Sequence, residues 1–165
     1  MQHLKGGAEA EAEKWMTAAA IVAQNALCLR SHCGSVVVKD GEIIGKGYNA
    51  PPLDDIKLRT CLHSYDASKK PKYDLTCCMH AEWRAIMDAL RHNPDKIRGA
   101  KLYFCRIDEN NKIKRSGEPY CTHCSRMAFD AGLSHFLLWQ EQGIAEYPAV
   151  EYNELSYQYF ARNNV

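Results

Sequence analysis

Residues 34–48 read GSVVVKDGEIIGKGY, and this stretch decides how the fold begins. Two short runs rich in β-branched residues, 34–39 and 42–48, flank the dipeptide Asp40-Gly41. Asp-Gly between two such runs is a strong signal for a tight β-hairpin. The stretch therefore predicts an antiparallel pair of strands that opens a sheet.

Helical and extended patterns alternate outward from this hairpin. Before it, apolar residues recur at steps of three and four over residues 10–29, which predicts an amphipathic helix. After it, the patterns predict helices over 81–91 and 121–131 and strands over 101–106 and 135–139. This alternation predicts an α/β fold in which helices pack on a mixed sheet of five strands.

The length of the chain, 165 residues, fits a single domain over residues 1–165. Three segments fall outside the regular pattern. Residues 1–8 are expected to be disordered, residues 50–79 form an inserted loop, and residues 146–165 form an aromatic-rich tail. Connections longer than about 12 to 15 residues are usually functional or disordered. The insert therefore needs an explanation.

Charge and hydropathy exclude several classes of protein. Lys and Arg number 21 and Asp and Glu 20, so the net charge of +1 lacks the basic excess of a polynucleotide binder. No apolar run is long enough for a membrane-spanning helix, and the first residues lack the pattern of a secretory signal. We therefore expect a cytoplasmic protein that acts on a small molecule.

Two short motifs place metal-binding residue types at the starts of two predicted helices. Residues 78–82 read CMHAE and residues 119–124 read PYCTHC. Each motif is weak by itself, because Cys-x-x-Cys also fits a redox pair or a zinc knuckle. Cysteines at positions i and i+3 share one helix face, however, and a histidine can supply a third ligand. Together the motifs predict that His80, Cys121 and Cys124 bind zinc.

Three protein ligands leave one position of tetrahedral zinc open, which is typical of a catalytic site. Water at that position is acidified enough to act as a nucleophile at neutral pH. Glu82 lies two residues from His80, so we expect it to be the catalytic residue that moves protons between water, a ring nitrogen and a departing amine.

This combination of His-x-Glu with a later Cys-x-x-Cys resembles the cytidine and deoxycytidylate deaminase superfamily. Residues 31–38 and 41–49 resemble its first hairpin, especially in the deoxycytidylate branch. The resemblance implies a three-layer α/β/α sandwich with a five-stranded mixed sheet, a homo-oligomer, and a free cytosine nucleotide or nucleoside as substrate, with dCMP favoured. It also implies that Asn49 contacts the sugar and that the backbone amide of Ala81 helps to hold the base.

Three residues near the motifs are further candidates for substrate binding. Tyr120 separates the proline from the first cysteine, whereas in the family the proline directly precedes the cysteine. Either the geometry of this turn differs or Tyr120 caps the pocket. Arg84 departs from the family pattern; it reaches a substrate phosphate or a neighbouring subunit, or is simply solvated. His123, between the two cysteine ligands, contacts the substrate or faces solvent.

The insert contains a second set of metal-ligand types. We expect either a second, structural zinc or buried thiols beside a surface histidine, and the resemblance also allows an extra metal. The candidate ligands are Cys61, His63, Cys77 and Cys78, with Cys33 as a further one. Cys28 and Cys105 lie in apolar segments and are expected in the core. Arg30 and the basic residues of the insert are candidates for binding a 5′ phosphate, although interspersed acids favour a solvated loop. The insert's basic residues are Lys57, Arg59, Lys69, Lys70 and Lys72.

Three other functions remain open from the residues alone. An adenine- or guanine-type deaminase, including one that acts on tRNA, would use the same metal ligands. In a zinc-stabilised interaction module the metal would only hold the fold, but such a site prefers four protein ligands. A redox protein using Cys121 and Cys124 would hold no stoichiometric zinc.

Overall fold

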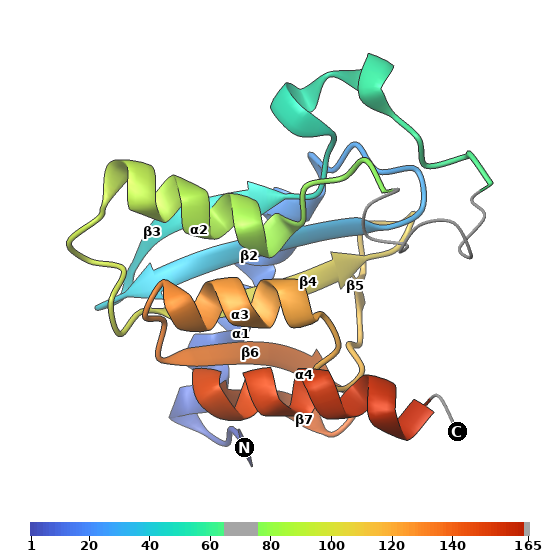
Figure 1. The fold of residues 1–165 in the computed structure, drawn as a ribbon. Helices are drawn as coiled ribbons and strands as arrows, with labels where there is room; N and C mark the ends of the chain where they lie inside the picture. Colours follow the sequence, from blue (N-terminus) through green and yellow to red (C-terminus); the bar gives the residue numbers. More distant parts are fainter. Residues whose placement is uncertain (65–75, 164–165) are drawn as a thin grey trace.

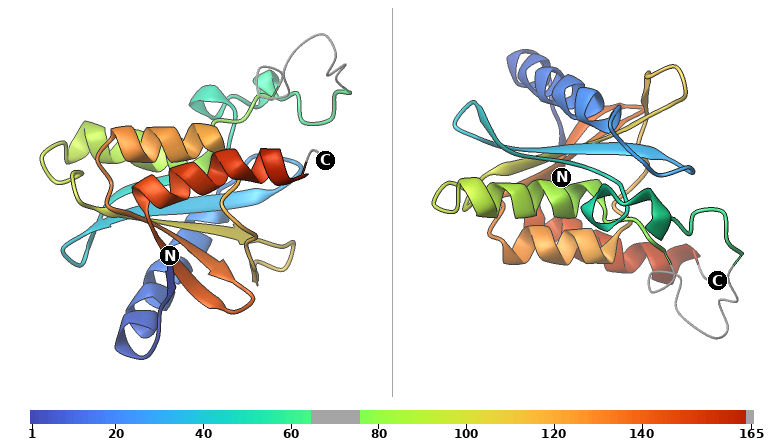
Figure 2. Two further views of the ribbon diagram at one scale, coloured as in Figure 1. Left: turned by 60° about the horizontal axis from the view of Figure 1, so that its bottom comes forward. Right: turned by 90° about the horizontal axis from the view of Figure 1, so that it is seen from above.

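The computed structural model describes residues 1–64 and 76–163. Within them, a twisted mixed sheet lies between one helix and a layer of three helices (Figures 1 and 2). The elements in chain order are β1 (Gln2–His3), α1 (Gly7–Ala23), β2 (His32–Lys39), β3 (Glu42–Tyr48), the 3-10 turns η1 (Pro52–Asp54) and η2 (Ile56–Leu58), α2 (Ala81–His92), β4 (Lys101–Ile107), β5 (Ile113–Lys114), α3 (Thr122–Asp130), β6 (His135–Gln140), β7 (Gly143–Pro148) and α4 (Ala149–Asn163).

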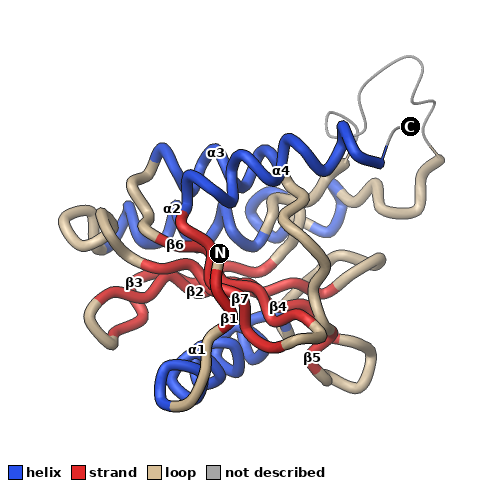
Figure 3. The backbone as a smooth tube through the Cα atoms, turned by 90° about the horizontal axis from the view of Figure 1, so that it is seen from below, coloured by secondary structure: helices blue, strands red, loops and turns tan. Residues whose placement is uncertain are grey.

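The sheet has the order β1-β7-β6-β4-β2-β3, and β5 pairs with β4. β4 and β6 are parallel, and the other pairs are antiparallel. α1 covers one face, while α2, α3 and α4 cover the other, as Figure 3 shows from below. The predicted three-layer α/β/α sandwich is therefore confirmed, although the described residues form seven strands rather than five.

The predicted hairpin is formed by β2 and β3. Asp40 and Gly41 at its tip both have positive φ angles, 49° and 77°, as a two-residue hairpin turn requires. The predicted helix over 10–29 begins earlier, at Gly7, and ends at Ala23.

Both terminal segments that were expected to lie outside the regular pattern contain strands and helices. Residues 1–8 are ordered, contrary to the prediction. Gln2 and His3 pair with Glu146 and Ala145 of β7, and α1 starts at Gly7. The segment predicted as an aromatic-rich tail completes β7 and forms α4, which ends at Asn163. β7 escaped prediction because four successive residues in it are buried, which removes the alternation typical of a half-exposed strand.

Helix α2 lies unusually close to β3, and glycines make the approach possible. The buried small side chains Ala81, Ala85 and Ala89 recur every four residues along α2. They face Gly45 and Gly47: a Cβ added to Gly47 would lie 2.2 Å from the carbonyl oxygen of Ala81. This contact fixes the start of α2. No helix in the described ranges combines the length and the apolar character needed to cross a bilayer.

We expect Gly47→Ala to displace the start of α2 and to lower the free energy of unfolding by about 1–3 kcal/mol, because the new methyl group meets backbone atoms that cannot turn aside. Urea denaturation measures the loss. Gly7→Ala is the matched control, since a Cβ there meets nothing within 4 Å. Equal stability of the two variants would contradict the close approach of α2.

Candidate metal centre and pocket

Two helix starts bring the predicted metal ligands together. His80 is the N-cap of α2 and Cys121 is the N-cap of α3. The two helices run in the same direction across one face of the sheet, with their N-termini at the same edge (Figure 1). The partial positive charge at a helix N-terminus favours thiolates in this position.

The three side chains have the geometry of a zinc site. Nδ1 of His80 lies 3.1 Å from Sγ of Cys124 and 3.6 Å from Sγ of Cys121. All three ligand atoms lie within 4.8 Å of one another. With Zn–N and Zn–S bonds of about 2.1 and 2.3 Å, tetrahedral zinc keeps neighbouring ligand atoms about 3.5–3.8 Å apart. The donor set therefore fits zinc in type and number, and the separation of 3.6 Å between His80 and Cys121 matches the spacing of zinc ligands.

The same side chains shift one another's pKa. A hydrogen bond with Cys124 is the largest cause that lowers the pKa of Cys121 to about 4, and the interaction with His80 adds to it. Burial lowers the pKa of His80, but the hydrogen bond with Cys121 and the charge of Glu82 outweigh burial and raise it to about 9. These surroundings favour the thiolate form of Cys121, which is the form that binds a metal ion.

Glu82 is a buried carboxyl in the first turn of α2. Burial raises its pKa, and the positive charge of His80 opposes that rise. A carboxyl with a raised pKa can take up and release a proton near neutral pH, which is the property that general acid–base catalysis needs.

A pocket of about 460 Å³ opens in front of these residues. His80, Glu82 and Cys121 line it together with apolar side chains such as Phe104 and Leu138. Its volume falls within the range of about 300–1,000 Å³ that is usual for small-molecule sites. A buried carboxyl beside three metal ligands, in a pocket of this size, is the arrangement of a hydrolytic metal enzyme.

A comparison with protein families agrees with this chemistry. The family model described as the cytidine and deoxycytidylate deaminase zinc-binding region matches residues 9–139. The chain belongs to the cytidine and deoxycytidylate deaminase family. It is a zinc-dependent hydrolytic deaminase, as the sequence predicted.

Relatives within this deaminase family resemble the chain in sequence and in fold. A deoxycytidylate deaminase of Mycobacterium phage D29 is 30% identical over 135 residues, which cover 78% of this chain and 94% of that protein. The dCMP deaminase of cyanophage S-TIM5, solved with dCMP and dUMP, has a TM-score of 0.53 and 24% identity over 81% of this chain and 82% of that one. A cytidine deaminase from Burkholderia pseudomallei has a TM-score of 0.56 and 17% identity over 85% and 94% of the two chains.

Three of the predicted substrate-binding residues line the deaminase pocket: Asn49, Ala81 and Tyr120. The side chain of Asn49 is held by β2, because its Oδ1 accepts from the backbone N–H of Cys33 at 2.8 Å and its Nδ2 donates to the carbonyl of Ser31 at 2.8 Å. The ring of Tyr120 meets that of Tyr159 edge to face, with 5.0 Å between centroids.

The other two predicted substrate-binding residues do not line the pocket. Arg84 forms an ion pair with Asp54 at 2.8 Å, and its guanidinium lies over the ring of Tyr48. Its ion pair with Asp54 therefore ties η1 to α2. His123 lies beside Trp83, with 5.9 Å between ring centroids, and close to Arg126 on the outer side of α3.

The insert differs from the prediction in its ligand set. Cys61 and Cys78 lie together, but their neighbour is Cys28, which was expected in the core. His63 is exposed and takes no part in the two candidate metal groups among the described residues. Cys33 lines the catalytic pocket. Part of the insert's basic set lies outside the described residues, namely Lys69, Lys70 and Lys72.

The pocket lining includes residues outside the predicted set of site residues, among them two arginines and two tyrosines. Arg106 and Arg115 come from β4 and from the residue after β5, and Tyr152 and Tyr159 come from α4. The aromatic residues of segment 146–165 were the only signal for the last two. No local pattern marks the arginines, because β4 and β5 bring them together across a turn.

Proposed function

We propose that this protein deaminates a free cytosine nucleotide and that deoxycytidine monophosphate is its preferred substrate. The observation that carries the proposal is the lining of the pocket, which combines metal ligands and a buried carboxyl with three exposed arginines. The deoxycytidylate deaminase of Mycobacterium phage D29 supports the same substrate.

His80, Cys121 and Cys124 would hold the zinc. When bound there, the metal supplies an acidified water as the nucleophile. Glu82 would accept a proton from that water and pass it to N3 of the cytosine ring. It would then take the proton of the new hydroxyl at C4 and deliver it to the amine. A C4–O bond forms, the C4–N bond breaks, and ammonia leaves, so cytosine becomes uracil.

The substrate phosphate would bind at the rim of the pocket. Arg30, Arg106 and Arg115 all line it and are all exposed. The guanidinium of Arg115 lies 4.2 Å from the ring centroid of Trp139, which holds it in place. Among the lining residues within 1–64 and 76–163, the acidic side chains are Glu82 and Glu118. Arginine suits this role because its planar fork binds phosphate oxygens through two parallel hydrogen bonds.

The remaining lining residues would place the nucleoside between these two ends. The backbone N–H of Ala81 belongs to the first turn of α2 and has no acceptor within the helix, so it can donate to the base. Asn49 has one amide hydrogen left for the sugar. Tyr120, with Tyr159 against it, would cover the base from the open side.

Ammonia release from a panel of substrates tests this function: dCMP, CMP, deoxycytidine, cytidine, adenosine and guanine. We expect kcat/KM for dCMP to exceed that for deoxycytidine by at least about 100-fold, because hydrogen bonds to charged groups contribute about 1.5–3 kcal/mol each. Equal kcat/KM values for dCMP and deoxycytidine would show that the protein does not recognise the phosphate. Turnover of adenosine or guanine alone would assign a purine deaminase.

The double variant Arg106→Gln/Arg115→Gln tests the phosphate site directly. We expect kcat/KM for dCMP to fall about 100-fold while that for deoxycytidine stays unchanged, since only the nucleotide uses these side chains. Arg91→Gln, an exposed arginine of α2 outside the pocket lining, is the control. An equal fall for both substrates would show that the arginines act on the fold instead.

A further inference from the structure

The side chain of Trp83 lies against the imidazole ring of His80. The two ring centroids are 5.2 Å apart and the ring planes differ by 22°, so the rings are stacked. His80 is the N-cap of α2, and Trp83 follows it by three positions. Side chains three positions apart at the start of a helix lie on the same face, so the spacing of the two residues brings their rings together.

Within residues 1–64 and 76–163, the hydrogen-bonding contacts of the His80 ring lie on its metal-binding side. They join Nδ1 to the sulfur atoms of Cys121 and Cys124, which are the other two proposed ligands, and Nε2 has no protein group as a partner. The ring also makes no capping hydrogen bond to α2. A metal-binding histidine is usually oriented by a hydrogen bond from its second ring nitrogen. In this chain the indole of Trp83 supports the ring from outside the ligand set.

Trp83 also contacts the helix that carries both cysteine ligands. Its ring is tilted by 57° against that of His123, with 5.9 Å between the centroids. His123 lies between Cys121 and Cys124 in the first turn of α3. The indole therefore lies between the two helix starts that supply the metal ligands, one ring neighbour coming from each.

The indole N–H of Trp83 indicates that the ring faces, and not the polar atom, define this position. Nε1 is buried and has no hydrogen-bond partner among the described residues. A buried tryptophan N–H usually finds a partner, and an unpaired one is unfavourable. What the side chain of Trp83 offers its surroundings is an aromatic face toward His80.

We propose that Trp83 is a positioning residue for the catalytic zinc, because its indole holds the His80 ring with Nδ1 directed at the metal. Stacking restricts the rotation of the imidazole before the metal binds. Less freedom is then lost on binding, which raises the affinity. The inference rests on the proposed ligand role of His80 and does not depend on which nucleotide the protein deaminates.

The zinc affinity of the full-length protein, measured by competition with a chromogenic chelator, tests this role. Trp83→Leu should bind the catalytic zinc about 10–100-fold more weakly, which is the usual loss when a group that orients a ligand is removed. Trp83→Phe should stay within about threefold of the unaltered protein, because a phenyl ring can still stack on His80. Ile86→Val is the control, since it shortens a fully buried side chain of the same helix and should leave the affinity unchanged.

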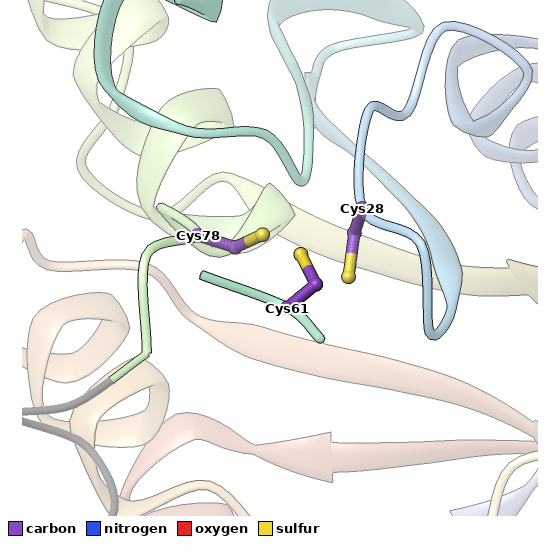
Figure 4. Close-up of side chains that lie close together, drawn as sticks. All are labelled: Cys28, Cys61 and Cys78. Carbon is purple, nitrogen blue, oxygen red and sulfur yellow. The ribbon is translucent and has the colours of Figure 1, made fainter. Parts of the chain in front are cut away.

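The catalytic ion is counted as the zinc that Cys124→Ser removes. This definition is needed because Cys28, Cys61 and Cys78 form the other candidate metal group among the described residues (Figure 4). Unchanged affinity in Trp83→Leu, or an equal loss in Trp83→Phe, would overturn the positioning role alone. If Cys124→Ser removed no zinc, the ligand assignment would fail and the role of Trp83 with it.

NMR of the unaltered protein loaded with ¹¹³Cd keeps the test valid if Trp83→Leu does not fold. Scalar coupling to the metal identifies the ring protons of His80. We expect a coupled proton to resonate upfield of the ordinary imidazole range, because the His80 ring lies over the indole. The upfield shift should shrink in Trp83→Phe, whose ring is smaller. Coupled protons at ordinary positions in the unaltered protein would contradict the stack.

Discussion

Glu82→Gln should lower kcat by about 10²–10⁴-fold and leave the zinc content unchanged, because the amide keeps the size of the side chain but cannot carry a proton. Glu82 is buried beside His80 and Cys124, so its carboxyl is placed to serve the water and the leaving amine in turn. Steady-state turnover of dCMP and zinc analysis on the same sample measure both quantities.

Asp88→Asn is the matched control for this variant. Asp88 lies on the same helix but outside the pocket, where its carboxylate accepts from the backbone N–H of Lys46 at 2.9 Å. We expect its kcat to stay within about twofold, since it touches no reacting group. If the Glu82→Gln protein retained more than a tenth of the activity, Glu82 would not be the residue that transfers the protons.

Cys124→Ser should have the second large effect, on metal and activity together. The side chain is fully buried, and its Sγ lies 3.1 Å from Nδ1 of His80. Serine is a much weaker zinc ligand than thiolate, so we expect the chain to lose one zinc and its turnover to fall below detection. Zinc analysis, dCMP turnover and circular dichroism measure the loss.

The contrast between these two variants separates the roles of metal and carboxyl. Glu82→Gln should be inactive with its catalytic zinc present, whereas Cys124→Ser should be inactive without it. Cys105→Ala, which removes a buried thiol from β4 that is in neither candidate metal group, should keep both zinc and turnover. Full activity of Cys124→Ser would exclude the proposed metal centre.

The local features of the fold and site were predictable from the sequence. The β2–β3 turn follows from Asp40-Gly41, and the pairing of Cys121 with Cys124 follows from their i, i+3 spacing. His80 and Glu82 could be assigned because the two motifs support each other. Within the turn and within each motif, the decisive spacing is only a few residues long.

Features that depend on long-range packing were not predictable. Cys28 lies 33 residues before Cys61, and no spacing rule links them. Arg106 and Arg115 reach the same rim only because β5 folds back on β4. Arg84 lies close to the metal motif in the sequence, but it forms an ion pair with Asp54, which lies 30 residues earlier in the chain.

Incubation of zinc-loaded protein with dCMP in ¹⁸O-labelled water tests the central claim most directly. The product is identified by mass spectrometry, and ammonia is measured in parallel. We predict dUMP that carries one ¹⁸O atom at C4, with one ammonia released per dUMP formed, because the water oxygen replaces the amine. Folded, zinc-loaded protein that forms no dUMP from dCMP would contradict the account.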